Sequence, residues 1–183
     1  GSSFNRGVSF TNEATGALTG AGTISVGAGN TLTNKGAISP GVAGGDTTGT
    51  LTITGNLAMS STASLNMDLN SPLAGDYDAV SVSGTASLTG ATLNLSGGAG
   101  PGAFVLLTAN GGLGGTTFTS INTGTFAQTP TYATNTLSIG VSSNSNASIY
   151  WDRGANTNNW EDAANWSNDL VPTSASTLYV GSG

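Results

Sequence analysis

Few side chains in this sequence could do chemistry, because its 183 residues include no His and no Cys. That removes the commonest general base, the thiolate nucleophile and the usual zinc ligands. Carboxylates remain, and Asp76 and Asp78 flank Tyr77. Residues two apart on a strand point the same way, whereas a glycosidase holds its two carboxylates across a cleft, roughly 5 to 9.5 Å apart. We therefore interpret both aspartates as solvated residues at a loop edge and predict that the protein is not an enzyme.

Oxygen ligands of the kind that calcium prefers occur in two places. Asp46 stands alone in the glycine-rich run "GGDTTG", and four of the nine acidic residues gather near the C-terminus. These four are Asp152, Glu161, Asp162 and Asp169. Plain surface acidity explains them as well as a bound calcium ion does, so we expect no cofactor and keep calcium as the alternative.

All three tryptophans, Trp151, Trp160 and Trp166, lie in the last forty residues. Beside Asn and Asp side chains they could form a platform on which sugar rings stack. They could equally form the small core of this segment, where each ring would bury roughly 150–250 Å². We favour the core and keep a carbohydrate-binding module as the alternative function.

The charge balance excludes nucleic acid and anionic membrane surfaces as partners. The formal net charge is −6, and the three basic residues cannot form the basic stripe that binding to nucleic acid requires. No apolar run approaches the roughly 20 residues needed to span a bilayer. Only 7% of residues are charged, against about 25% in an ordinary soluble domain. No signal peptide is present in the sequence, which leaves a cytosolic protein or a mature or excised piece of a secreted one. The near absence of Lys and Arg and the abundant Thr, Ser, Asn and Gly favour the secreted protein, and the absence of Cys fits bacterial secretion.

Short sequences recur at regular steps near the N-terminus. The tripeptide "FTN" at residues 10–12 is followed 22 positions later by "LTN" at 32–34, and "GALT" at 16–19 is followed 20 positions later by "GAIS" at 36–39. Short runs of alternating apolar and polar residues, separated by Gly, Asn or Ser, continue to residue 141. We predict an all-β, parallel solenoid with coils of about twenty residues, in which like residues stack about 4.8 Å apart. A β-sandwich or jelly roll would alternate in the same way and is the structural rival.

The apolar residue of each alternating pair should point into the coils. Thr and Ser at the outward positions suit β geometry without adding charge. The positions predicted to face inward are Val8, Phe10, Leu18, Ile24, Val26, Leu32, Ile38, Leu51, Ile53, Leu57, Met59, Leu65, Met67, Leu69, Val80, Val82, Leu88, Leu93, Leu95, Val105, Leu107 and Ile139.

Residues 7–142 resemble the passenger region of bacterial autotransporter and filamentous-haemagglutinin-like surface proteins. The runs that carry the resemblance are "GTISVGAGNTLTNKGAISPG", "GTLTITGNLAMSSTASLNMDL", "DYDAVSVSGTASLTGATLNLS", "FVLLTANGGLGGTTFTSIN" and "TYATNTLSIGV". The resemblance implies a right-handed parallel β-helix that is exported and displayed outside the cell, where many such proteins are adhesins. Polysaccharide lyases share this shape, but they use a basic residue and clustered carboxylates. Lys35 and Arg153 stand apart from any such cluster.

The last part of the chain differs in character. The run "WDRGANTNNWEDAANWSNDLVP" resembles segments that recur between β-helical blocks in large bacterial surface proteins. We therefore predict a solenoid domain at 1–146 and a Trp-rich segment at 147–183 that links or caps the next copy. Joining the final "STLYVGSG" to the initial "GSSFNRGVSFTN" continues the strand and turn pattern, as one unit of a longer array would.

Open strand edges at the two ends predict self-association, because an unpaired edge recruits another chain. A contact between unlike ends propagates as a filament unless it closes a ring. We therefore predict an extracellular structural or adhesive protein that forms a head-to-tail homopolymer or a tandem array, with surface glycans as further candidate partners. The residues predicted at this assembly interface are Phe4, Val8, Phe10, Leu178, Tyr179 and Val180.

Overall fold

The structure of the protein, a computed structural model, describes residues 2–41, 48–98, 101–124, 126, 128–141, 148–166, 171–172 and 177–179. The chain forms two compact units, Gly1–Val141 and Ser142–Gly183. None of the helices in the described part of the chain has the length and hydropathy needed to cross a bilayer.

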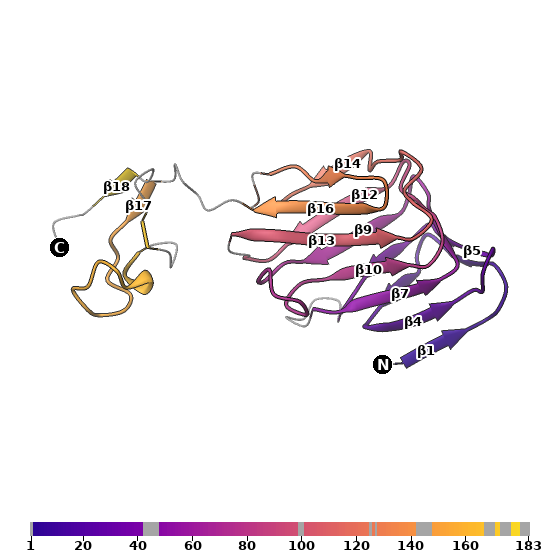
Figure 1. The fold of residues 1–183 in the computed structure, drawn as a ribbon, viewed down its shortest axis with the longest axis horizontal. Coiled ribbons are helices and arrows are strands. Elements are labelled where there is room, and N and C mark those ends of the chain that lie inside the picture. Colours follow the sequence, from indigo (N-terminus) through magenta and orange to yellow (C-terminus); the bar gives the residue numbers. More distant parts are fainter. Residues whose placement is uncertain are drawn as a thin grey trace. The chain divides into compact units, whose positions relative to one another are not determined.

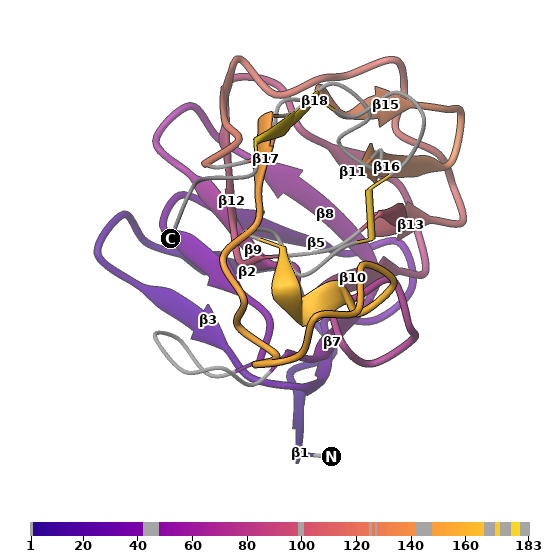
Figure 2. The ribbon, with the colours of Figure 1, turned by 90° about the vertical axis from the view of Figure 1, so that its left-hand side faces the viewer.

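The described residues of the first unit form three sheets, and up to Ser96 each turn of the chain adds one strand to each of them (Figures 1 and 2). Sheet A contains, in spatial order, β1 (Ser2–Asn5), β4 (Gly22–Ser25), β7 (Thr50–Thr54), β10 (Ala79–Val82), β13 (Gly102–Ala109), β16 (Thr136–Val141) and β15 (Thr131–Tyr132). Sheet B contains β11 (Ala86–Ser87), β8 (Asn56–Met59), β5 (Thr31–Asn34) and β2 (Phe10–Asn12). Sheet C contains β14 (Ser120–Asn122), β12 (Thr92–Ser96), β9 (Ser64–Asp68), β6 (Ala37–Ser39) and β3 (Ala17–Thr19).

The pairing confirms the predicted β-solenoid. Strands β1 to β12 pair only in parallel, which a sandwich or jelly roll would not do. The repeated tripeptides lie directly over one another, with Phe10 beside Leu32 and Asn12 beside Asn34. The second repeat stacks in the same way, with Leu18 beside Ile38. The repeats in the sequence therefore correspond to the residues that pair in the sheets.

The predicted coil length holds only for the first turn. Ser2 pairs with Gly22, twenty positions further on, but Leu51 pairs with Val80, twenty-nine positions further on. The additional residues lie in the turns, above all between sheets C and A, as in residues 69–78 between β9 and β10. The strands stay short while the turns lengthen, because only the strands must match the coil beneath.

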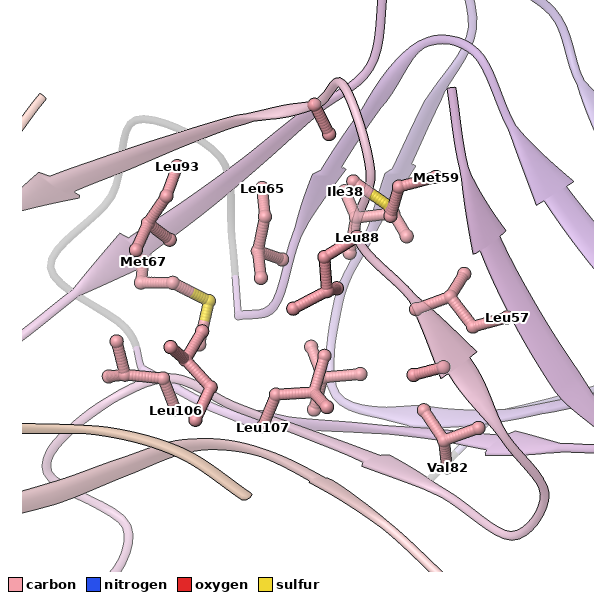
Figure 3. Packing of buried hydrophobic residues seen from close by; sticks show 14 of the residues in the cluster. Ile38, Leu57, Met59, Leu65, Met67, Val82, Leu88, Leu93, Leu106 and Leu107 are labelled. Carbon is pink, nitrogen blue, oxygen red and sulfur yellow. The ribbon is translucent and has the colours of Figure 1, made fainter. Parts of the chain in front are cut away.

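The apolar side chains of all three sheets meet inside the coil. Figure 3 shows side chains from all three sheets in this interior, with Met67 of sheet C near Leu106 of sheet A, and Leu57 of sheet B near Val82 of sheet A. Most of the predicted inward positions are buried, and Phe10 and Leu18 in the first turn are partly buried against the core. The period-2 pattern thus identified the core correctly in the middle of the solenoid.

Two predicted inward positions are wrong. Val8 is 52% exposed, because it lies in the bend before β2 and not on a strand. Val105 is 37% exposed, because the register of β13 against β16 shifts between Val105 and Leu107. Beyond this bulge Leu106 and Leu107 are both buried. One extra residue in a strand therefore exchanges the buried and exposed positions on its two sides.

The C-terminal end of the solenoid is closed by a feature that the repeats did not predict. Strand β16 runs antiparallel to β13, and β15 runs antiparallel to β16. Leu137 and Ile139 of β16 are fully buried. These strands cover the edge of β13 that a further parallel coil would otherwise occupy.

Two buried asparagines order the turns between sheets B and C. Asn12 Nδ2 donates to Asn34 Oδ1 over 2.7 Å and to the carbonyl of Gly16 over 3.2 Å, and Asn34 Nδ2 donates to the carbonyl of Gly36 over 2.9 Å. A Cβ atom at Gly36 would collide with the carbonyl oxygen of Gly16. The turns stack closely because they contain glycine and because amide groups satisfy their buried carbonyls.

In the part of the second unit that the structure describes, β17 (Ser148–Tyr150) and β18 (Thr177–Tyr179) pair in parallel, and a short 3-10 helix, η1 (Ala163–Asn165), lies between them in the sequence. Its described residues include the three tryptophans.

We expect Ile38→Ala to lower the free energy of unfolding of the solenoid by about 2–5 kcal/mol, because it leaves a cavity in a fully buried position. Thr11→Ala, at an exposed position of β2, should change it by less than about 0.5 kcal/mol. Denaturant unfolding followed by far-ultraviolet circular dichroism measures both. Equal effects of the two substitutions would contradict the assigned core.

Candidate functional site

The sequence suggested that Asp76 and Asp78 lie on one face of a strand, but the structure places neither of them in a strand. Both precede β10, in the turn that follows β9. Asp76 is exposed and accepts a hydrogen bond from Ser71 Oγ over 2.9 Å. Asp78 is only 1% exposed, so its interpretation as a solvated residue is wrong. The bridge between Leu69 and Tyr77 closes this turn and draws Asp78 inwards.

The carboxylate of Asp78 joins three strands at one corner of the solenoid. Its Oδ1 accepts a hydrogen bond from the backbone N–H of Gly49, before β7, over 2.9 Å. Its Oδ2 accepts one from the backbone N–H of Asp68, in β9, over 3.0 Å. Burial raises the pKa of Asp78 to about 6, aided by the nearby Asp68 carboxylate and opposed by the two backbone hydrogen bonds. This group therefore acts as a structural clamp.

The raised pKa of Asp78 predicts a pH dependence of stability. The folded protein binds this proton more tightly than the unfolded chain, since the pKa rises from its usual 3.8 to about 6. The free energy of unfolding should therefore fall as the pH rises from about 4 to about 6, by up to about 3 kcal/mol, and level off above that. Denaturant titrations across this range measure it. In Asp78→Asn this component should vanish, and an unchanged pH profile in the variant would contradict the assignment.

The tryptophans form one cluster in the second unit. The rings of Trp151 and Trp160 stack with centroids 5.5 Å apart and an interplanar angle of 28°. The Trp166 ring meets both edge-on, at 4.9 Å from Trp151 and 5.3 Å from Trp160. Trp166 is 1% exposed, whereas Trp160 is 53% exposed. The cluster is thus a small core with one ring open to solvent.

Polar contacts hold the loops around this cluster. Trp166 Nε1 donates to the carbonyl of Trp160 over 3.0 Å. Asn165 Nδ2 donates to Thr157 Oγ1 over 2.8 Å and to the carbonyl of Asn159 over 3.0 Å. Thr157 Oγ1 in turn donates to Asp162 Oδ2 over 3.2 Å. These bonds place the exposed ring of Trp160 on a connected frame.

Of the acidic residues considered for calcium, the structure describes Asp152, Glu161 and Asp162. Among the described residues, no three His, Cys, Asp or Glu side chains lie close enough to hold a metal ion. Asp152 Oδ1 accepts a hydrogen bond from the backbone N–H of Gly154 over 3.0 Å. Asp46 and Asp169 lie outside the described residues.

The N-terminal turn of the solenoid has an apolar groove of about 480 Å³. Phe4 and Phe10 line it, with ring centroids 5.9 Å apart, and Leu18, Ile24 and Leu51 continue it inwards. Phe4 is 47% exposed. Within the described structure, β1, β2 and β3 each pair with one strand and so end their sheets. The groove and the three unpaired edges together form the N-terminal end surface of the solenoid.

The residues predicted for the other side of the interface belong to the second unit. Leu178 and Tyr179 lie in β18, opposite Ile149 and Tyr150 of β17. Val180 lies outside the described residues. Sequence reasoning placed the first two on a strand correctly, but it did not identify β17 as the partner strand.

Parallel, in-register stacking of three sheets identifies the chain as a β-solenoid protein, and this architecture is consistent with a β-helical passenger. No protein-family model matches the chain, and no curated protein matches it.

The cluster geometry predicts that Trp166 stabilises the second unit more than Trp160 does. Trp166→Ala should lower the free energy of unfolding of this unit by about 3–5 kcal/mol, because it removes the buried ring that contacts both others. Trp160→Ala, at the half-exposed ring, should cost less. Tryptophan fluorescence reports only on this unit, since it contains all three tryptophans. A larger loss in Trp160→Ala would contradict the assigned core.

Proposed function

We propose that the protein is an extracellular structural or adhesive β-solenoid of a bacterial cell surface, which assembles head-to-tail into filaments or forms one unit of a long surface array. The observation that carries the proposal is the N-terminal end surface, where an apolar groove lies beside three unpaired strand edges. Natural proteins cover or charge such edges when they stay monomeric.

Little charge protects this end surface. Arg6 lies over the Phe10 ring, 5.6 Å from its centroid, and so places one positive charge beside a residue of the groove. Lys35 Nζ and Glu13 Oε2 form an ion pair of 3.1 Å, which leaves no net charge on that side of the turn. An incoming strand would therefore meet a nearly neutral edge with an apolar groove behind it.

The outer faces of the sheets also suit a passive, rigid surface. Thr23, Thr52, Ser81 and Thr108 stack in register across sheet A. On sheet C, Asn122 Nδ2 donates to Asn94 Oδ1 over 2.7 Å, a bond that continues to Asn66 over 2.7 Å and from there to Ser39 Oγ over 2.9 Å. Such uncharged ladders stiffen the surface and repeat it along the solenoid axis. They support a role in display or adhesion.

The antiparallel cap at the C-terminal end of the solenoid limits how copies could join. Because β16 and β15 already cover β13, the N-terminal end surface of another copy would find no open parallel edge there. Among the described residues of the second unit, β18 pairs with β17 alone, so its other edge is a candidate for this contact. The asymmetry supports assembly through unlike ends.

Light scattering tests the proposed assembly, and electron microscopy distinguishes filaments from single rods. Phe10→Asp, which places a charge in the groove, should shift the protein to monomers. Ser61→Asp is the matched control, because it adds the same charge at an exposed position in the turn between β8 and β9, away from this surface. A parent protein that stays monomeric at high concentration, or equal effects of both variants, would contradict the role of this surface.

A carbohydrate-binding module is the second candidate, favoured by the exposed ring of Trp160 stacked on Trp151. An exposed aromatic face on a fixed frame can stack against a sugar ring. A glycan array tests it: binding that Trp160→Ala abolishes, with fluorescence still showing a folded second unit, would establish this function. Binding that is absent, or unchanged in the variant, would refute it.

A further inference from the structure

Strands β17 and β18 of the second unit are separated by the same number of residues as strands in the longer turns of the solenoid. Ser148 pairs with Thr177, twenty-nine positions further on and in parallel. Leu51 and Val80, in neighbouring turns of sheet A, are separated by the same number of residues. Parallel strands need a long crossover between them. The second unit thus has the pairing and the spacing of one solenoid turn, with the tryptophan cluster within its crossover.

The sequences of these strands match sheet A. "SIY" of β17 lies in register with "TLY" of β18, just as the repeated tripeptides do in the first turns. The run "STLYVGSG" at 176–183 also aligns with "GTISVGAG" at 22–29, which begins with β4. In this alignment Thr177 corresponds to Thr23, and Leu178 corresponds to Ile24. The second unit therefore resembles sheet A in sequence as well as in period.

We propose that β18 of one copy pairs in parallel with β1 of a second copy and so continues sheet A across the two molecules. The alignment gives the register because β4 pairs with β1, Thr23 beside Ser3 and Ile24 beside Phe4. Thr177 of one copy then lies beside Ser3 of the next, and Tyr179 lies beside Asn5. The inference rests on the proposed function and names the two strands that form the assembly interface.

The direction of the strands fits this arrangement. In a parallel solenoid each new turn is added on the same side of the last one, so the turn after β18 would pair with its free edge. The turn before β1 would likewise pair with the free edge of β1, since β4 occupies the other edge. The order β17–β18–β1–β4 therefore keeps one direction throughout. It also satisfies the N–H and C=O groups of both edges and brings a strand over the groove beside Phe4.

The absence of Cys makes disulfide cross-linking a clean test. Four single substitutions, Ser3→Cys, Asn5→Cys, Thr177→Cys and Tyr179→Cys, are combined in pairs and oxidised mildly. S3C/T177C and N5C/Y179C place the cysteines opposite each other, with Cα atoms about 4.8 Å apart, within reach of a disulfide. S3C/Y179C and N5C/T177C displace them by two positions to about 8 Å, which is too far.

The expected result is a ladder of covalent multimers on denaturing gels for the two matched pairs and not for the two displaced pairs. Because the same four substitutions make up both sets, a folding defect in one of them cannot produce this pattern. Equal cross-linking in all four pairs, or a cross-linked species of monomer size, would overturn the proposed pairing. If the parent protein assembles in light scattering but the matched pairs do not cross-link, only this interface is refuted. Parent protein that stays monomeric refutes the proposed assembly as well.

Discussion

Parallel backbone pairing between successive turns is the constraint on which the rest of the structure depends. Each strand of sheets A, B and C is stabilised by the turn below and supports the turn above, so side chains at equivalent positions stack. Stacking explains why apolar residues recur on the inner face, why amides and hydroxyls form ladders outside, and why buried asparagines follow one another between sheets B and C. A residue must suit the equivalent positions in the turns above and below it.

Under the same constraint, the outermost strands of the described stack differ at its two ends. Towards the C-terminus the chain reverses direction, and β16 covers β13 with a strand that cannot continue the parallel stack. At the N-terminus β1, β2 and β3 remain open beside an apolar groove. This asymmetry links the fold to the proposed assembly.

The second unit combines a solenoid-like strand pair with a core of another kind. One turn alone has no neighbouring turn against which to bury its apolar face, and packed aromatic rings can supply the missing contacts. Trp166 is buried among its neighbours, and Trp160 remains half exposed. The cluster thus suits a segment that must stay folded beside open strand edges.

Local pattern in the sequence determined the strands, their parallel stacking and most of the core. Repeats such as "FTN" and "LTN" stack similar residues in neighbouring turns, and the alternation of apolar and polar residues separates buried from exposed positions. Only the tertiary structure decided the features that depend on distant contacts. The lengths of the turns, the antiparallel cap of β16 and the bulge after Val105 follow from how chain segments meet, which period-2 alternation does not encode. Asp78 shows a related limit: it lies two and four positions before the buried Val80 and Val82, but its charge indicated a surface residue, and hydrogen bonds from Gly49 and Asp68 hold it in the interior. The alternation at Leu178 and Tyr179 predicted a strand. It did not predict the partner strand β17, because the paired residues lie 29 positions apart in the sequence.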